Sequence, residues 1–410
     1  MNRVAIVGVG LVSSLGNDWK TVSTSLKKGK SGIGLNQSFI DKGLRSHISG
    51  QVHSERTATI DKKFARFMGD GGKWAHLAME DAVAQAQLSE AQLSSEETAL
   101  IVGAGGIASD DLLDAVDVLD TKGVKRIGPY RVTREMTSSV SATLSTAFKI
   151  KGPSYSISSA CATSAHCIGS GYQQIKMGLQ TTVVAGGIDQ LHWSFAMLFD
   201  GMGALSTKFN DEPENASRPY DERRDGFVIS GGAGIVILEN WDHAVSRGAN
   251  ILGEVVGYAA TSDGDNMVAP NGVGAERAMT LALKDAKLSE IDYINTHGTS
   301  TPVGDLAELK AIARVFPNNM PLISSTKSLS GHGLGAAGVH EMIFSLIMMR
   351  ENFVCASANL EQADDIAQDL PIVKEMKEQA VNTVLSNSFG FGGTNACLVL
   401  KKVESSLNNK

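Results

Sequence analysis

The sequence predicts an α/β protein in which helices cover both faces of a sheet of parallel strands. Short apolar runs typical of strands alternate along the chain with longer stretches of helical periodicity. Glycine is abundant, at 43 of 410 residues, which suits many tight turns between strands and helices. Only 9 prolines argue against disordered linkers, and a chain of this length usually forms about two domain-sized units.

The expected elements fall into two successive series. In the first, strands are expected at residues 4–9, 99–102, 154–158, 182–185 and 235–239, and helices at 72–86 and 162–177. After a turn at residues 247–250, strands are expected at 251–259, 292–294 and 321–324, helices near 275–286 and 339–349, and closing strands at 381–386 and 396–401. The restart of the pattern suggests two similar halves.

A cysteine lies where one expected strand turns into a helix. Cys161 follows the strand at 154–158 and opens the helix at 162–177. Unpaired amides at a helix start favour the thiolate over the thiol, and the thiolate is the nucleophile. A free cysteine is more often an inert, buried residue, so a catalytic role for Cys161 depends on its partners.

Two histidines provide candidate partners. His297 and His332 each follow a predicted strand, in loops rich in glycine, serine and threonine. Because loops at the carboxyl ends of strands converge in open α/β sheets, we expect both imidazoles to lie close to Cys161. A Cys/His hydrolase is one enzyme class that fits, although a second histidine and Lys327 are more than it needs.

A glycine-rich motif raises a dinucleotide-binding oxidoreductase as another alternative. Residues 333–338 read G-x-G-x-x-G between a predicted strand and a predicted helix. That motif should begin at the strand end, and here residues 327–332 intervene. Gly8 opens a second near-match, but Ser13 replaces its third glycine, and lysines stand where a ribose-binding acid is expected. Binding of NAD or FAD is therefore disfavoured.

Five segments along the chain match one family in order. They are residues 160–166, 297–301, 327, 331–338 and 387–395. On these motifs the chain resembles the β-ketoacyl-acyl-carrier-protein synthases of the thiolase superfamily, and the resemblance runs from Val4 to Leu400. The sequence around Cys161 is similar to that of type I synthases, which use a Cys-His-His site. A non-catalytic partner subunit of a condensing complex would lack the cysteine.

The resemblance implies a fold and a division of the chain. The expected fold is the duplicated, five-layered α-β-α-β-α thiolase architecture. Residues 1–249 would form the half that carries the nucleophile, residues 250–404 the half that carries both histidines, and residues 405–410 a polar tail.

The resemblance also implies a reaction, the elongation of fatty acids by decarboxylative Claisen condensation. Cys161 would hold the acyl group, and malonyl-acyl carrier protein would lose carbon dioxide and attack it, giving 3-oxoacyl-acyl carrier protein. The expected catalytic residues are Cys161, His297, His332, Lys327 and Phe391. The backbone amides of Cys161 and Phe391 would bind the first oxyanion, and two neutral imidazoles would stabilise the enolate.

Further residues acquire expected roles in the same way. Substrate would contact Gly106, Met136, Phe199, Phe227, Thr299, Thr301 and Phe389. Thr299 and Thr301 would form hydrogen bonds with the pantetheine arm. Phe389 and Phe391 would form a gate to the acyl channel. Met136 would reach the acyl channel of a second subunit. Glu341 would pair with a buried Lys327, and Asp305 and Glu308 would be structural. A type II synthase with another chain-length preference is the close alternative.

The expected partners are acyl carrier protein and a second copy of the chain. No bound cofactor is expected, because phosphopantetheine travels on the carrier. The carrier is acidic and this chain has a formal charge of -7, so docking would use local basic patches. These are Lys62, Lys63 and Arg66, and a second run of Lys122, Lys125, Arg126, Arg131 and Arg134. Nucleic acid is an improbable partner for this charge.

Cysteine usage and hydropathy indicate the compartment. Four cysteines without paired spacing indicate a reducing environment, and no His/Cys cluster in the sequence has zinc-site spacing. The first apolar run is too short for a signal peptide, and no later run is long enough to span a bilayer. A cytoplasmic protein without metal or membrane contact is expected.

Overall fold

A ten-stranded mixed sheet forms the centre of the molecule. In the computed structural model, which describes residues 1–106 and 109–403, this sheet runs in the order β10-β9-β13-β14-β8-β1-β7-β6-β4-β5. Its strands are β1 (Val4–Val12), β4 (Thr98–Ala104), β5 (Ser154–Tyr155), β6 (Thr182–Asp189), β7 (Gly232–Asn240), β8 (Gly253–Ser262), β9 (Tyr293–Asn295), β10 (Leu322–Ser324), β13 (Thr383–Gly390) and β14 (Thr394–Lys401).

The strand order repeats itself. Numbered within their own series, the first five strands lie in the order third, second, fourth, fifth, first, and the last five lie in the same order. The two series meet where β1 pairs antiparallel with β8, from Val4 opposite Val255 to Ile6 opposite Gly253. The expected duplication is therefore present in the topology. The expected boundary after residue 249 falls between the two series and stays a prediction, and the expected tail at 405–410 lies outside the described residues.

The expectation of parallel strands throughout is wrong. The pairings β10–β9, β9–β13, β6–β4 and β4–β5 are parallel, but every pairing from β13 across to β6 is antiparallel. The connection between β13 and β14, residues 391–393, is too short for the crossover that parallel neighbours need. The expected strand at 154–158 is shorter too, because only Ser154 and Tyr155 pair with β4.

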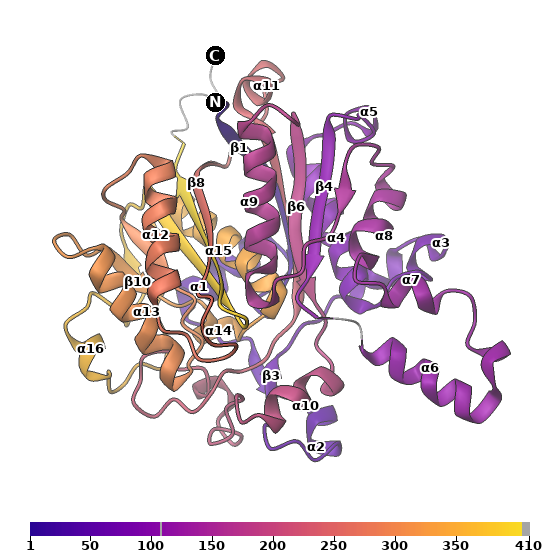
Figure 1. Ribbon diagram of the computed structural model, residues 1–410, viewed down its shortest axis with the longest axis horizontal. Helices are drawn as coiled ribbons and strands as arrows, with labels where there is room; N and C mark the ends of the chain where they lie inside the picture. The colour runs from indigo at the N-terminus through magenta and orange to yellow at the C-terminus, as the bar shows by residue number, and fades with distance from the viewer. Residues whose placement is uncertain (107–108, 404–410) are drawn as a thin grey trace.

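Helices form three layers around this sheet. They are α1 (Trp19–Lys28), α2 (Gln37–Asp41), α3 (Lys62–Ala65), α4 (Asp70–Ala86), α5 (Glu90–Leu93), α6 (Ser109–Lys122), α7 (Arg131–Glu135), α8 (Ser139–Phe148), α9 (Thr163–Lys176), α10 (Trp193–Gly201), α11 (Trp241–Ser246), α12 (Val273–Ala286), α13 (Pro302–Val315), α14 (Lys327–Ser330), α15 (Ala337–Glu351) and α16 (Asp365–Gln368). Helices α4 and α12 cover the outer faces, and α9 and α15 pack against each other between the two strand series (Figure 1). The result is the expected five-layered arrangement.

Two small sheets complete the fold. One joins β2 (Ile33–Leu35) to β3 (Ile48–Gly50), and the other joins β11 (Phe353–Val354) to β12 (Lys377–Glu378). Among residues 1–106 and 109–403, we find no helix with the length and apolar character needed to cross a bilayer.

The central layer of helices brings the segment of Cys161, before α9, close to the segment of His332, before α15. Helix α15 is mostly apolar, and every residue from Ala337 to Met349 is buried, His340, Glu341 and Ser345 included, as expected of a helix enclosed by other elements. Gly338 lets it approach α9, because a Cβ there would lie 3.0 Å from Ala165. The starts of α9 and α15 therefore lie side by side at one edge of the sheet.

Candidate active site

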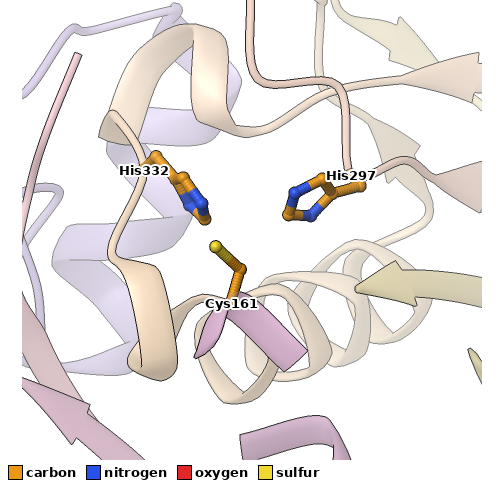
Figure 2. A group of neighbouring side chains, drawn as sticks. All are labelled: Cys161, His297 and His332. Carbon is orange, nitrogen blue, oxygen red and sulfur yellow. The ribbon is translucent and has the colours of Figure 1, made fainter. Parts of the chain in front are cut away.

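Cys161, His297 and His332 meet at this edge, as the sequence predicts. The cysteine sulfur and a ring nitrogen of each histidine all lie within 4.8 Å of one another. The sulfur points toward the His332 ring, and the His297 ring lies on the other side of the cysteine (Figure 2). Cys161 lies in the short 3-10 turn Ala160–Ala162 before α9, His297 follows β9, and His332 follows α14.

The backbone before the nucleophile is held in a constrained turn. Ala160 has φ of 49°, a conformation that a residue with a Cβ adopts only when its surroundings impose it. The amide of Ser159 donates to Thr163 Oγ1 at 2.8 Å, and Ser159 Oγ lies 2.6 Å from His166 Nδ1. These bonds tie the turn to α9 and orient the Cys161 side chain toward the histidines.

In the free protein, burial outweighs the expected effect of the helix start on the Cys161 thiol. Burial raises the pKa of the Cys161 thiol to about 12. The positive charge of Lys327 and the amides of Phe391 and Cys161 act in the opposite direction but do not outweigh burial. The thiol is therefore neutral at pH 7, and it must lose its proton while substrate is bound.

Both histidines are neutral and have free ring nitrogens. Burial, reinforced by the charge of Lys327, holds the pKa of His297 and of His332 well below the usual range. Among the described residues, no group forms a hydrogen bond with Nδ1 of His297 or with either nitrogen of His332. Two uncharged imidazoles can therefore each donate an N–H to one ligand oxygen.

Lys327 is buried beside the histidines and paired with Glu341, as the sequence predicts. Both side chains are 2% exposed and form an ion pair through Lys327 Nζ and Glu341 Oε1. Burial raises the pKa of Glu341 to about 7 even though Lys327 lowers it. The pair thus places a positive charge next to the site without exposing it to solvent.

Asp305 and Glu308 hold the loop of His297 from beneath, which agrees with the structural role expected for them. Asp305 Oδ1 accepts the amides of Thr299, Ser300 and Thr301 at 3.0 to 3.3 Å. Glu308 accepts the amides of His297 and Gly298 at 2.9 and 2.8 Å. Burial raises the pKa of Asp305 to about 6 and also raises that of Glu308.

A largely apolar cavity of about 450 Å³ opens onto the three side chains. Its lining includes five of the seven expected substrate contacts, namely Phe199, Phe227, Thr299, Thr301 and Phe389, together with the expected catalytic residue Phe391. The rings of Phe227 and His332 meet edge to face with centroids 5.5 Å apart, and the ring centroids of Phe389 and His297 lie 5.9 Å apart. The site can therefore exclude water from a reacting group while keeping a route to the surface.

The Phe391 loop lies at the mouth of this cavity. The Phe391 side chain is 38% exposed, whereas its amide is near enough to lower the pKa of Cys161. Gly392 and Gly393 have φ of 86° and 67°, values that favour glycine, and a Cβ on Gly393 would lie 2.7 Å from Asp263. The tight turn therefore aims the Phe391 amide inward and leaves the ring at the entrance.

Two expected contacts lie outside the cavity lining. Gly106 instead packs behind it, where a Cβ would lie 2.7 Å from the ring of Phe195. Met136 lines a separate apolar cavity of about 200 Å³ with Phe64, Phe67 and Met68. Within one chain, Met136 therefore does not meet the Cys161 site.

The two expected basic patches adjoin, but part of the second is neutralised. Arg134 Nε donates to the carbonyl of Arg66 at 3.0 Å, which joins the patches. Arg131 and Arg134 both form ion pairs with the buried Asp111, and their side chains are only 24% and 26% exposed. The docking role expected for these two arginines stays a prediction, and Asp111 reduces the charge that they can offer a partner. The exposed cations are Lys62, Lys63, Arg66, Lys122, Lys125 and Arg126.

Cysteine and histidine side chains also form zinc sites, but the surroundings of these three residues do not suit a metal ion. Metal-bound histidines normally donate their second N–H to a carboxylate or a carbonyl. Within the described residues, His332 and Nδ1 of His297 lack such acceptors. The buried charge of Lys327 also opposes a cation here. These features favour a catalytic site, and in the described part of the chain no carboxylate orients either ring as a hydrolase triad would require.

The glycine motif does not form a dinucleotide site. Residues 333–338 are buried, and they lead into the enclosed helix α15. A Cβ on Gly338 would lie 2.9 Å from Ser388 Oγ. The glycines therefore serve close packing of backbone segments, with no surface that a pyrophosphate could reach.

Sequence reasoning missed three residues that shape the site. Phe195 lines the cavity beside Phe199, with ring centroids 5.2 Å apart. His166 bonds to Ser159, and Asp189 accepts three backbone amides near Cys161. His166 lay within a matched motif, but nothing in the sequence marked Asp189 or Phe195 as part of the site.

Comparisons with known proteins agree with this geometry. Family models described as "Beta-ketoacyl synthase, N-terminal domain" and "Beta-ketoacyl synthase, C-terminal domain" match residues 1–244 and 252–361. The 3-oxoacyl-[acyl-carrier-protein] synthase 1 of Haemophilus influenzae is 52% identical over 404 residues, covering 98% of this chain and 99% of that protein. The 3-oxoacyl-[acyl-carrier-protein] synthase 2 of Rhizobium meliloti is 37% identical over 422 residues, covering 98% of this chain and 99% of that protein.

Solved structures show the same fold. A β-ketoacyl synthase from Burkholderia phymatum superposes with a TM-score of 0.93 at 34% identity, covering 98% of this chain and 100% of that chain. A ketosynthase from a type II PKS, solved in complex with its acyl-carrier protein, gives a TM-score of 0.89 at 26% identity, with 98% and 100% covered.

Proposed function

The chain belongs to the β-ketoacyl synthase family, and from this premise we propose that it elongates fatty acids by decarboxylative Claisen condensation. Malonyl-acyl carrier protein would condense with an acyl group held on Cys161 to give 3-oxoacyl-acyl carrier protein and carbon dioxide. One observation carries the proposal: two uncharged histidines with free ring nitrogens lie within 4.8 Å of a cysteine sulfur in an apolar cavity.

The first half-reaction transfers the acyl group to the enzyme. The bond from Cys161 Sγ to the acyl carbon forms, the carbon–sulfur bond to the carrier breaks, and the thiol proton leaves with the carrier thiol. Negative charge on the acyl oxygen is stabilised by the amides of Cys161 and Phe391, both of which are close to the sulfur.

The second half-reaction forms the new carbon–carbon bond. The malonyl group loses carbon dioxide, and the enolate oxygen accepts N–H bonds from His297 and His332, whose low pKa values keep them neutral. The enolate carbon attacks the acyl carbon, the bond from that carbon to Cys161 Sγ breaks, and the departing thiolate takes a proton from solvent to restore the neutral thiol. Aromatic walls, including Phe227 and Phe389, keep water from protonating the enolate.

Lys327 serves the histidines electrostatically. Its buried charge favours the neutral imidazoles and also lowers the pKa of the Cys161 thiol. Glu341 limits the cost of burying that charge.

The carrier protein supplies the prosthetic group, so the enzyme itself would bind no cofactor. Thr299 and Thr301 line the cavity, and their hydroxyls lie 3.0 Å apart, so both can bond a pantetheine amide. The acidic carrier would dock on the exposed cations around Lys63, Arg66 and Lys125. A cytoplasmic location fits four cysteines that are all free thiols.

We also propose that the chain forms a homodimer. Strand β5 ends the large sheet with Ser154 and Tyr155 exposed, so its outer edge can pair with a second strand. Helix α6 extends away from the rest of the molecule (Figure 1). Four of its apolar side chains are 40 to 47% exposed, namely Leu112, Leu113, Val116 and Leu119. A second copy would cover these four side chains and bring its own Met136 toward the cavity that holds Cys161.

The type II alternative differs only in chain-length preference. The Haemophilus influenzae synthase 1 is 52% identical to this chain and the Rhizobium meliloti synthase 2 is 37% identical, which favours the type I assignment. The decisive experiment incubates the protein with acyl- and malonyl-carriers of defined length and identifies the products by mass spectrometry. Formation of 3-oxoacyl-carrier with an acyl adduct on Cys161 is expected. Absence of both products would refute the proposal, as would saturable NADPH oxidation by the pure protein.

A further inference from the structure

The buried carboxylate of Asp189 joins two separate loops of the site. Asp189 ends strand β6 and is 2% exposed. Its Oδ1 accepts the amide of Gly106 at 3.1 Å, and its Oδ2 accepts the amides of Gly105 at 3.2 Å and Gly335 at 2.6 Å. Gly105 and Gly106 follow β4, whereas Gly335 lies three positions after His332.

The glycines around this carboxylate make the junction tight. A Cβ on Gly105 would lie 2.5 Å from Asp189 Oδ2 and 3.0 Å from the carbonyl oxygen of Ala160. A Cβ on Gly335 would collide with the amide nitrogen of Gly105. The three segments therefore touch through backbone atoms, so that the position of one restricts the other two.

A buried carboxylate is costly to keep at this position. Burial raises the pKa of Asp189 to about 7, while its three amide donors lower it. Each donor in the described structure is a backbone amide, so no side-chain cation offsets the charge. Negative charge here also raises the pKa of the Cys161 thiol. The three amides need an acceptor here, because an unpaired buried N–H group costs free energy, so the carboxylate holds the three glycines together.

The two loops serve different half-reactions. Gly105 lines the acyl cavity beside Ala160 and Cys161, and Gly106 packs against Phe195. Gly335 belongs to the segment that carries His332, which acts on the malonyl group. We propose that Asp189 is a positioning residue for both half-reactions, because its single carboxylate fixes the wall of the acyl cavity relative to the His332 loop.

This inference rests on the proposed condensing activity, and three variants test it. Asp189→Asn keeps the size of the side chain but replaces one acceptor oxygen with an NH₂ group, which cannot accept a hydrogen bond from a backbone amide. Asp189→Glu restores the carboxylate. Asp292→Asn is the matched control, because Asp292 Oδ2 also accepts two backbone amides, those of Asn382 and Thr383, at the far end of β9 from the site.

Rapid-quench acylation of Cys161 and carbon dioxide release from malonyl-carrier are measured for each variant, together with the thermal melting temperature. Asp189→Asn should lose roughly tenfold or more in both rates, because displacements of about 1 Å cost up to a hundredfold. Half-saturating carrier concentrations should change little, since docking and pantetheine contacts are untouched. Asp189→Glu should recover part of both rates, and Asp292→Asn should match the parent protein.

Several results would overturn the inference. It fails if Asp189→Asn keeps both rates within about twofold, or if Asp292→Asn loses as much as Asp189→Asn. If Asp189→Asn does not fold, Gly335→Ala decides, because its Cβ would push Gly335 away from Gly105 while Asp189 is retained. A folded Gly335→Ala protein with both rates intact would then refute the role. Failure of the parent protein to condense would refute the proposed function instead.

Discussion

The imidazole rings of His297 and His332 meet edge to face, with centroids 5.2 Å apart and planes inclined by 87°. The rings come from loops that follow different strands, yet both are uncharged and have ring nitrogens without a partner among the residues that the structure describes. Such a pair can direct two N–H groups at one oxygen from different directions. The geometry suits an oxygen that gains charge during a reaction better than it suits a base for a neighbouring thiol.

Replacing either histidine with alanine should therefore separate the two half-reactions. Carbon dioxide release from malonyl-carrier should fall on the order of a hundredfold or more, as expected for the loss of one oxyanion donor. Acylation of Cys161 should fall much less, since the Cys161 and Phe391 amides remain. Rapid-quench assays of both steps provide the measurement. A histidine variant that decarboxylates normally but no longer becomes acylated would instead identify that histidine as the cysteine's base.

Changes at Cys161 should isolate the decarboxylation step. Cys161→Ala should abolish the acyl-enzyme, whereas Cys161→Gln should still release carbon dioxide from malonyl-carrier, because both histidines are unchanged. Intact-protein mass spectrometry and a carbon dioxide assay measure these outcomes, with circular dichroism as the control for folding. An acyl adduct found on Cys161→Ala would show that another residue is the nucleophile.

The reactivity of the free thiol should depend steeply on pH. Since burial raises the pKa of Cys161 to about 12, the neutral thiol dominates below that pH, and the thiolate fraction grows about tenfold with each pH unit. Iodoacetamide should therefore react with a rate that keeps rising from about pH 7 to 9.5. The other three cysteines are buried, so Cys161→Ala should stay unlabelled over the same time. A plateau near pH 8 would show that the amides at the helix start outweigh burial.

A larger side chain at Gly106 should shorten the accepted acyl chain. A Cβ at this position would lie 2.7 Å from Phe195, so Gly106→Val should push that ring into the cavity. Transfer of long acyl chains onto Cys161 should fall about tenfold or more, while short chains remain substrates. Acylation with carriers of graded length measures the effect. Gly201→Ala is the control, because a Cβ there meets no atom within 4 Å. Equal losses for short and long chains would contradict this account.

The protein should sediment as a dimer. Changing Val116 and Leu119 to aspartate would place charges on the exposed face of α6 and should weaken association, since a second copy is expected to cover this face. Analytical ultracentrifugation of the parent and the double variant tests the prediction. The paired change of Met177 and Leu179, which are also exposed and apolar, to aspartate is the control. A parent protein that sediments as a monomer would rule the homodimer out.

The sequence predicted the reacting side chains better than their surroundings. Cys161, His297 and His332 could be placed together because each follows a predicted strand, and strand ends share one edge of a sheet. Asp189 could not be found in this way, because its partners are backbone amides, which leave no trace in residue identity. The ion pair of Arg134 with Asp111 could not be predicted from the basic run that ends in Arg134, because Asp111 lies more than twenty positions earlier in the chain.

The antiparallel strands at the centre were missed for a related reason. Alternation of apolar runs and helices identifies which segments are strands, but it does not determine which strands become neighbours. The pairing of β1 with β8 joins segments about 250 positions apart, and no local pattern announces it.

The burial of α15 has a consequence for how the protein unfolds. This helix packs against α9 and β7 from the first strand series and β13 from the second, and residues 337–349 are all buried among them. Separating the two series would expose the apolar surfaces through which α15 packs against α9 and β7, on both parts of the chain, at a large cost in free energy. The chain should therefore melt in one cooperative transition, and residues 1–249 expressed alone should aggregate.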